Sequence, residues 1–180
     1  AFLPAWPQLV VFLYQLALLR VLWALAIERP PQPWRSVAAI AAGLTLGPLL
    51  AGVQLLPGLG AARESVRSMG LAAKEVAMSD IHGFSAFRNY LGGGWVYGQP
   101  FSVIPCLLAA LAALGPWGRR IATFYAAAGV LFFALSLGTQ TPLFDLYFAL
   151  PGMRVFREPA RFVWVTGFCL SVLAALGADT

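Results

Sequence analysis

Three arginines stand immediately before the last apolar stretch of the chain, and they are the most specific chemical feature of the sequence. They are Arg154, Arg157 and Arg161. Pro159, between the last two, suits the first position of a helix because its missing N–H is not needed there. A helix N-terminus carries partial positive charge and unpaired N–H groups, so together these groups would bind a phosphate at the level of lipid headgroups. The alternative is interface anchoring, with Glu158 capping the helix and pairing with Arg161.

A second candidate site is a stretch rich in glycine and aromatic residues. Tyr90, Trp95 and Tyr97 lie within it. Their rings could stack on a sugar. Aromatic belts at the membrane surface have the same composition, so both interpretations stay open.

Catalytic and metal-binding patterns are sparse. Asp80 and His82 would supply two metal ligands, but no third lies nearby, and His82 is the only histidine. The pattern favours a polar loop, so we predict no metal site and no cofactor, and we assign no catalytic residue. Cys106 and Cys169 both lie inside apolar runs, which predicts unpaired thiols that pack as small hydrophobic side chains.

One arginine lies inside an apolar stretch. Arg20 is about 10 Å, or seven residues, from the end of that stretch by helix rise. Ionisable groups inside a membrane mark functional sites by default. The pattern slightly favours the alternative, in which the long side chain reaches the interface.

The elements that carry these residues belong to a membrane protein. Of the 180 residues, 60% are hydrophobic and 11% are charged, and the mean hydropathy is +0.78. Soluble domains carry about 25% charged residues, so this composition excludes a soluble domain. The net charge of +5 comes from basic residues scattered singly between apolar runs, which excludes nucleic acid as a partner and leaves membrane lipid.

A transmembrane helix needs about 20 mostly apolar residues. The sequence predicts an all-α polytopic bundle of about five helices, with interfacial helices in the first long loop, around residues 60–78. The predicted spans are residues 9–27, 37–56, 101–114, 121–137 and 162–178.

The density of basic residues predicts the orientation. It is higher in the short connections, which places these in the cytoplasm and makes 57–100 and 138–161 the extracytoplasmic loops. The chain begins and ends next to apolar sequence. We therefore expect residues 1–180 to form a single membrane domain that is a fragment of a larger protein.

Several short stretches in this order resemble the YfhO family of bacterial multi-spanning membrane proteins. The resemblance covers most of the chain from the second apolar stretch onward, and the proline-arginine segment is its most specific part. The stretches are VQLLP (53–57), ESVR (64–67), YG (97–98), LG (137–138), TPLF (141–144), LPG (150–152) and FREPAR (156–161).

That family is similar to the GT-C class of glycosyltransferases. The resemblance implies a bacterial plasma-membrane protein with a polyprenyl-phosphate-linked sugar as donor and a cell-envelope polymer, such as teichoic acid, as acceptor. In that class the catalytic carboxylate usually lies in the first extracytoplasmic loop, which this fragment does not reach. The alternatives are a lipid-linked saccharide transporter or flippase and a non-catalytic membrane scaffold. A transporter should have polar residues on several helices, and the second, fourth and fifth spans have almost none.

Overall fold

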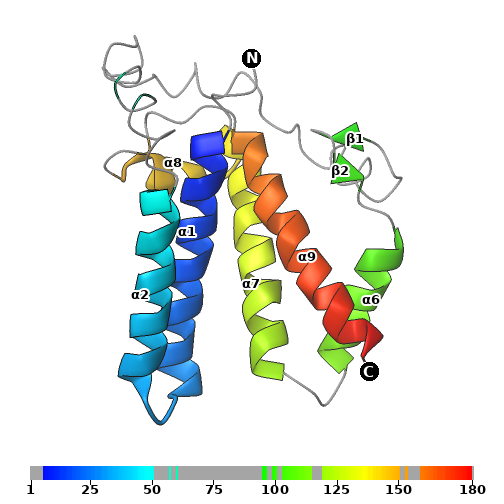
Figure 1. Cartoon of the computed structure of the whole chain (residues 1–180). Coiled ribbons are helices and arrows are strands. Elements are labelled where there is room, and N and C mark those ends of the chain that lie inside the picture. Colours follow the sequence, from blue (N-terminus) through cyan, green and yellow to red (C-terminus); the bar gives the residue numbers. More distant parts are fainter. Residues whose placement is uncertain are drawn as a thin grey trace.

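The described part of the chain is built almost entirely from helices (Figure 1). The computed structural model describes residues 6–50, 57, 60, 95–96, 99–100, 103–114, 119–150, 153 and 159–179. The α-helices are α1 (Trp6–Trp23), α2 (Pro33–Leu50), α6 (Val103–Leu114), α7 (Arg119–Ser136), α8 (Pro142–Phe148) and α9 (Phe162–Ala178). Two short antiparallel strands, β1 (Trp95–Val96) and β2 (Gln99–Pro100), pair Trp95 with Pro100. The all-α prediction is confirmed.

Two helical segments in the described residues are long and apolar enough to cross a membrane. They are Leu9–Glu28 and Pro159–Ala178, each 20 residues long. At about 1.5 Å per residue each spans about 30 Å, the thickness of a hydrocarbon core. The apolar part of α7, Arg120–Ser136, is shorter, and α6 has 12 residues. A bundle of five crossing helices therefore stays a prediction.

The observed bounds of the helices can be compared with the spans predicted from the sequence. The α9 helix covers 162–178, as predicted, and α7 begins two residues before the predicted 121 and ends one before 137. The α2 helix begins at Pro33 rather than at residue 37, because proline is tolerated in the first turn. The predicted interfacial helices near residues 60–78 lie outside the described residues.

The first helix ends in a wider turn. A π-helical segment, Ala24–Glu28, follows α1, and the N–H of Arg29 donates to the carbonyl of Ala24 over 2.9 Å. Arg29 takes a left-handed conformation, with φ of 47°. Pro30 and Pro31 then prevent further helix, which is the stop signal that the sequence contains.

The helix ends lie at two opposite ends of the bundle (Figure 1). The end of the π-helical segment, the start of α2, the start of α7 and the end of α9 lie together at what we name the short-loop end. The starts of α1 and α9 and the whole of α8 lie at the opposite, long-loop end. The arginine-bearing start of α9 thus lies at the long-loop end.

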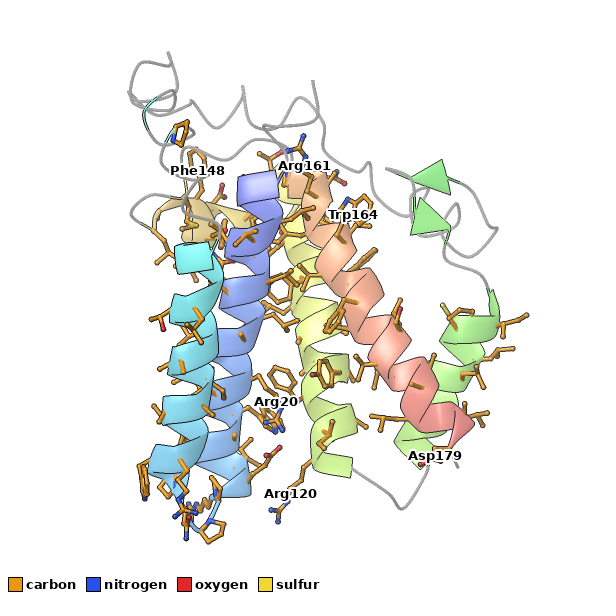
Figure 2. The ribbon with its side chains drawn as sticks, in the orientation of Figure 1. Arg20, Arg120, Phe148, Arg161, Trp164 and Asp179 are labelled. Atoms are coloured by element: carbon orange, nitrogen blue, oxygen red, sulfur yellow. The ribbon has the colours of Figure 1, made fainter. Side chains whose placement is uncertain are left out.

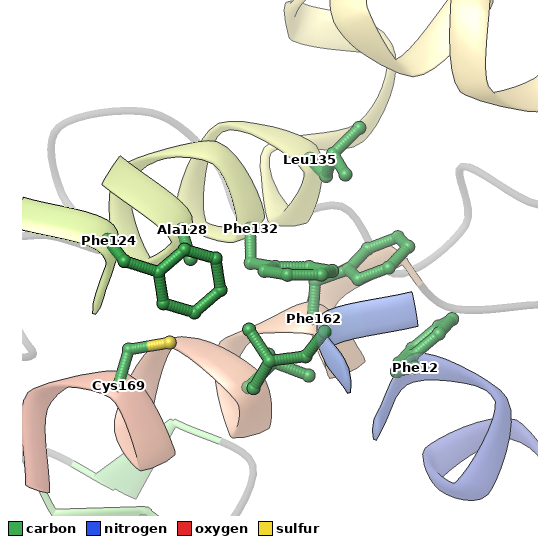
Figure 3. Packing of buried hydrophobic residues seen from close by; sticks show 9 residues of the cluster. Phe12, Phe124, Ala128, Phe132, Leu135, Phe162 and Cys169 are labelled. Atoms are coloured by element: carbon green, nitrogen blue, oxygen red, sulfur yellow. The ribbon is translucent and has the colours of Figure 1, made fainter. Parts of the chain in front are cut away.

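The core forms where α1, α7 and α9 meet (Figure 3). Phe12 of α1 stacks on Phe162 of α9 with 4.0 Å between ring centroids, and Phe132 of α7 lies 5.8 Å from the same ring. The outside of the helices is covered by large apolar side chains, including Ile104 and Val130. Such a surface suits lipid as the solvent, where close packing holds helices together.

The second long loop contains a helix that the sequence analysis treats as loop. Within 138–161, α8 begins at Pro142 after Thr141 in an extended conformation, and Phe144 of α8 is buried. Proline at the first helical position was the local signal for this helix. The sequence analysis did not predict this helix, because a seven-residue helix of this kind is stabilised by packing on the bundle rather than by its own length.

Candidate lipid-phosphate site and apolar groove

Arg161 lies at the long-loop end of α9 (Figure 2). It ends the short 3-10 turn Pro159–Arg161, in which Pro159 and Ala160 are buried, and it is itself half-buried. Pro159 therefore begins the helical segment, although α9 proper starts at Phe162. The first turn of α9, which is described in full, holds no carboxylate. The partial charge of the helix end thus adds to that of the Arg161 guanidinium.

The other predicted site residues cannot be placed beside it. Arg154, Arg157, Tyr90 and Tyr97 lie outside the described residues, as does Glu158. Trp95 belongs to strand β1, of which the backbone is described. Of the predicted site residues, Arg161 alone has a described side-chain position.

A groove that the sequence analysis missed runs beside α9. It has a volume of about 410 Å³ between α6, α7 and α9. On α9 it extends from Val163 to Leu173, which is about 15 Å along the helix. Small residues on the neighbouring helices leave the space open: Ala109, Ala110, Ala126 and Gly129.

The groove is apolar along its length. Two of its lining residues, Tyr125 and Thr166, carry a hydroxyl group, and the Thr166 hydroxyl donates to the carbonyls of Gly129 and Phe162 over 3.4 Å each. That hydroxyl is therefore used in joining α9 to α7. Cys106 and Cys169 both line the groove, and both are free thiols. A hydrocarbon chain fits such a lining better than a polar ligand does.

Arg161 and the groove lie on the same helix, but Arg161 is not among the residues that line the groove. The groove begins at Val163, two residues after Arg161, and follows α9 away from the long-loop end. A phosphate at the helix start would meet the guanidinium and the helix N–H groups. The hydrocarbon chain of the same molecule would then lie in the groove.

A polar contact holds α8 against the bundle next to this site. The side-chain amide of Gln15 on α1 donates to Tyr147 Oη over 3.1 Å and to Met153 Sδ over 3.5 Å. Tyr147 Oη lies 3.4 Å from Gln15 Oε1, to which it can donate, and its ring meets Phe162 edge-on at 5.1 Å. Burial raises the pKa of Tyr147, and the hydrogen bond with Gln15 lowers it in part, so the phenol stays protonated and able to donate.

Replacing Tyr147 by phenylalanine should destabilise the protein by about 1 kcal/mol, because the hydroxyl bonds to Gln15 are lost while the ring contacts stay. Thermal unfolding of the detergent-solubilised protein measures this. Tyr125→Phe is the matched control, since the Tyr125 ring packs on Phe124 and Phe168 and its hydroxyl makes no hydrogen bond within the described residues. Equal unfolding temperatures for the two variants would mean that the hydrogen bonds between Gln15 and Tyr147 do not stabilise the protein.

Arg20 lies away from this site, toward the short-loop end of α1 (Figure 2). Its guanidinium pairs with Glu28, with 3.0 Å between Nη2 and Oε1. The sequence analysis slightly favoured a side chain that reaches the membrane interface, and it did not predict the pairing with Glu28. Among the described residues, no group of three His, Cys, Asp or Glu side chains could hold a metal ion, and Asp80 and His82 lie outside them.

The chain matches no protein-family model, no curated protein and no solved structure. The resemblance to the YfhO family therefore stays a prediction.

Proposed function

We propose that this chain is part of a multi-pass bacterial plasma-membrane protein of the YfhO type. It uses a polyprenyl-phosphate-linked sugar to modify a cell-envelope polymer. The observation that supports this function best is Arg161 at the start of α9 with an apolar groove along the same helix. Polyprenyl phosphate matches these two features because it has one anionic head group, for Arg161, and one long hydrocarbon chain, for the groove.

The transfer chemistry explains why arginine is needed at this position. The acceptor hydroxyl oxygen forms a bond to the anomeric carbon while the bond from that carbon to the phosphate oxygen breaks. The phosphate leaves with the electron pair, and a base takes the hydroxyl proton. Negative charge grows on the leaving phosphate, so fixed positive groups stabilise the transition state. Arg161 supplies one such group, Arg154 and Arg157 are proposed as the others, and the base is not assigned.

The groove also bears on the competing transporter. A path for a saccharide needs polar side chains along its length, whereas this groove is lined mostly by apolar side chains. Its two hydroxyl groups belong to Tyr125 and Thr166, and that of Thr166 is already bonded. We therefore assign the groove to the polyprenyl chain. In this proposal the sugar lies at the long-loop end, where Tyr90, Trp95 and Tyr97 are candidates for stacking on it.

Filling the groove tests the function directly. Ala126 is exposed and lines the groove, so Ala126→Trp should occupy the space of the chain and weaken binding of polyprenyl phosphate about tenfold or more. Binding is measured on the purified chain in lipid nanodiscs, with polyprenol and inorganic phosphate as separate ligands. The full ligand should bind more tightly than either part.

Ala42→Trp is the matched control. Ala42 is exposed on α2, away from the groove, so the same change there should leave binding unaltered. If Ala126→Trp binds polyprenyl phosphate as tightly as Ala42→Trp does, the groove does not hold the chain. Absence of any polyprenyl-phosphate binding to the unchanged protein would favour the non-catalytic scaffold instead.

A further inference from the structure

Two side-chain donors near the short-loop end of α1, Arg20 Nη1 and Trp23 Nε1, are buried without a hydrogen-bond partner. Arg20 is also paired with the carboxylate of Glu28, with 3.0 Å between Nη2 and Oε1. A buried donor or acceptor that lacks a partner is costly, and such groups in folded proteins are nearly always satisfied. A group from outside the described chain is therefore expected to satisfy them.

The π-helical segment brings these residues to one face. Arg20 and Trp23 are three positions apart, so they are neighbours on the helix surface. Glu28 is eight positions after Arg20, which in a regular α-helix places it about 80° around the axis. The wider segment Ala24–Glu28 turns the chain less per residue and rotates Glu28 back toward Arg20. As a result Arg20 Nη2 lies 3.0 Å from Glu28 Oε1 and 3.1 Å from Oε2. Single π-helical turns occur often at functional sites.

An apolar pocket adjoins Trp23, and Arg20 and Glu28 are not among its lining residues. Its volume is about 350 Å³, between the end of α1 and α7, and Trp23, Leu19, Leu22 and Phe124 are among its lining residues. The Phe124 ring links the pocket to the charged pair, because Arg20 Cζ lies 5.4 Å from the centre of that ring. The Trp23 ring lies 5.8 Å from the same ring.

The chemistry of these side chains selects the ligand. Arg20 Nη1 and Trp23 Nε1 are unpaired donors, the Glu28 carboxylate is an acceptor, and the charges of Arg20 and Glu28 balance. A carboxylate or phosphate would be repelled by Glu28, and an ammonium group by Arg20. A hydroxyl accepts from the guanidinium or the indole and donates to the carboxylate.

We propose that this cluster and its pocket bind an uncharged single-chain lipid alcohol. The hydroxyl lies among Arg20, Trp23 and Glu28, and the hydrocarbon chain lies in the pocket against α7. This site is at the opposite end of the bundle from Arg161, so it does not depend on the proposed glycosyl transfer (Figure 2).

A photoreactive dodecanol with a diazirine in its chain tests the proposal on the full chain in detergent. Labelling should map to the end of α1 and to α7, and unlabelled dodecanol should compete about tenfold better than dodecane or dodecanoate. Equal competition by dodecane would overturn the proposal, because the hydroxyl would then not be recognised. Absence of saturable labelling would also overturn it, leaving water as the partner of Arg20 Nη1 and Trp23 Nε1.

A charge change provides a second readout that misfolding cannot imitate. Glu28→Gln keeps the shape of the side chain but leaves Arg20 with no opposing charge, so dodecanoate should now compete about tenfold better than dodecanol. Trp23→Phe should weaken competition by dodecanol but not by dodecane or dodecanoate. Trp164→Phe, at an exposed position on α9, should leave the competition by all three unchanged. An unchanged order of competitors in Glu28→Gln would contradict the site.

Discussion

Arg161→Ala should weaken binding of polyprenyl phosphate by about 10-fold to 150-fold. The range corresponds to about 1.5 to 3 kcal/mol for one hydrogen bond to a charged group. The physical reason is the position of Arg161 at the start of α9, where its charge adds to that of the helix end and the apolar groove begins two residues later. Direct binding to the purified chain in nanodiscs measures the loss of affinity. The same measurement on Arg157→Ala, alone and combined with Arg161→Ala, tests the predicted contact of Arg157 with the phosphate.

Lysine at position 161 distinguishes phosphate binding from interface anchoring. A lysine ammonium is a point charge and cannot form the paired contacts of a guanidinium on two phosphate oxygens, so Arg161→Lys should recover the affinity only in part. If Arg161 only anchors α9 at the interface, lysine should replace it almost fully. The alanine variant would then bind normally but unfold at a lower temperature.

Arg120→Ala serves as the matched charge control. Arg120 is exposed at the short-loop end of α7, so its loss removes the same charge from the far side of the bundle (Figure 2). Binding of polyprenyl phosphate should be unchanged in this variant. Unchanged affinity in Arg157→Ala and Arg161→Ala, alone and combined, would rule out the phosphate site.

Gly177→Ala should destabilise the packing of α9 on α6 by about 1 to 3 kcal/mol, the usual cost of overfilling a packed contact. A Cβ atom at Gly177 would overlap the carbonyl oxygen of Leu108, and it would lie 2.7 Å from the carbonyl carbon of Leu108 and 3.1 Å from the backbone nitrogen of Ala112. All three are backbone atoms of α6, which cannot rotate away as a side chain can. The two helices must therefore move apart.

Thermal unfolding in detergent measures this change, with Gly43→Ala as the control. A Cβ at Gly43 would have no atom within 4 Å, so alanine there should be neutral or slightly stabilising because it favours the helix. Equal stability of the two alanine variants would mean that α6 and α9 do not approach as closely as the structure has them.

The candidate site was only partly accessible to sequence reasoning. Arg161 could be proposed from the sequence because its signal is local: a proline, an arginine and an apolar run follow one another along the chain. The groove was missed because its lining is shared among α6, α7 and α9. The spacing of Ala109, Ala126 and Gly129 does not say which helix each small residue faces. That choice depends on contacts between segments far apart in the chain.

The sequence by itself predicts lipid as the solvent, and it determined the helices of the described chain apart from α8. Its shortage of charge predicts lipid, and its apolar runs bounded by proline and glycine predict helices, as the coincidence of α9 with 162–178 illustrates. Both follow from interactions within a few residues or from composition, which a reader of the sequence can evaluate directly.

Only the tertiary structure decided which side chains meet. Gln15 contacts Tyr147 across 132 positions of sequence, and Arg20 reaches Glu28 because the end of α1 widens into a π-helical turn. The close approach at Gly177 likewise exists only because α6 lies against α9. Such contacts depend on how whole helices pack, and in lipid many faces of an apolar helix are almost equally acceptable to the solvent. The hydrophobic pattern therefore left the helix faces undetermined, and close packing of particular side chains selected them.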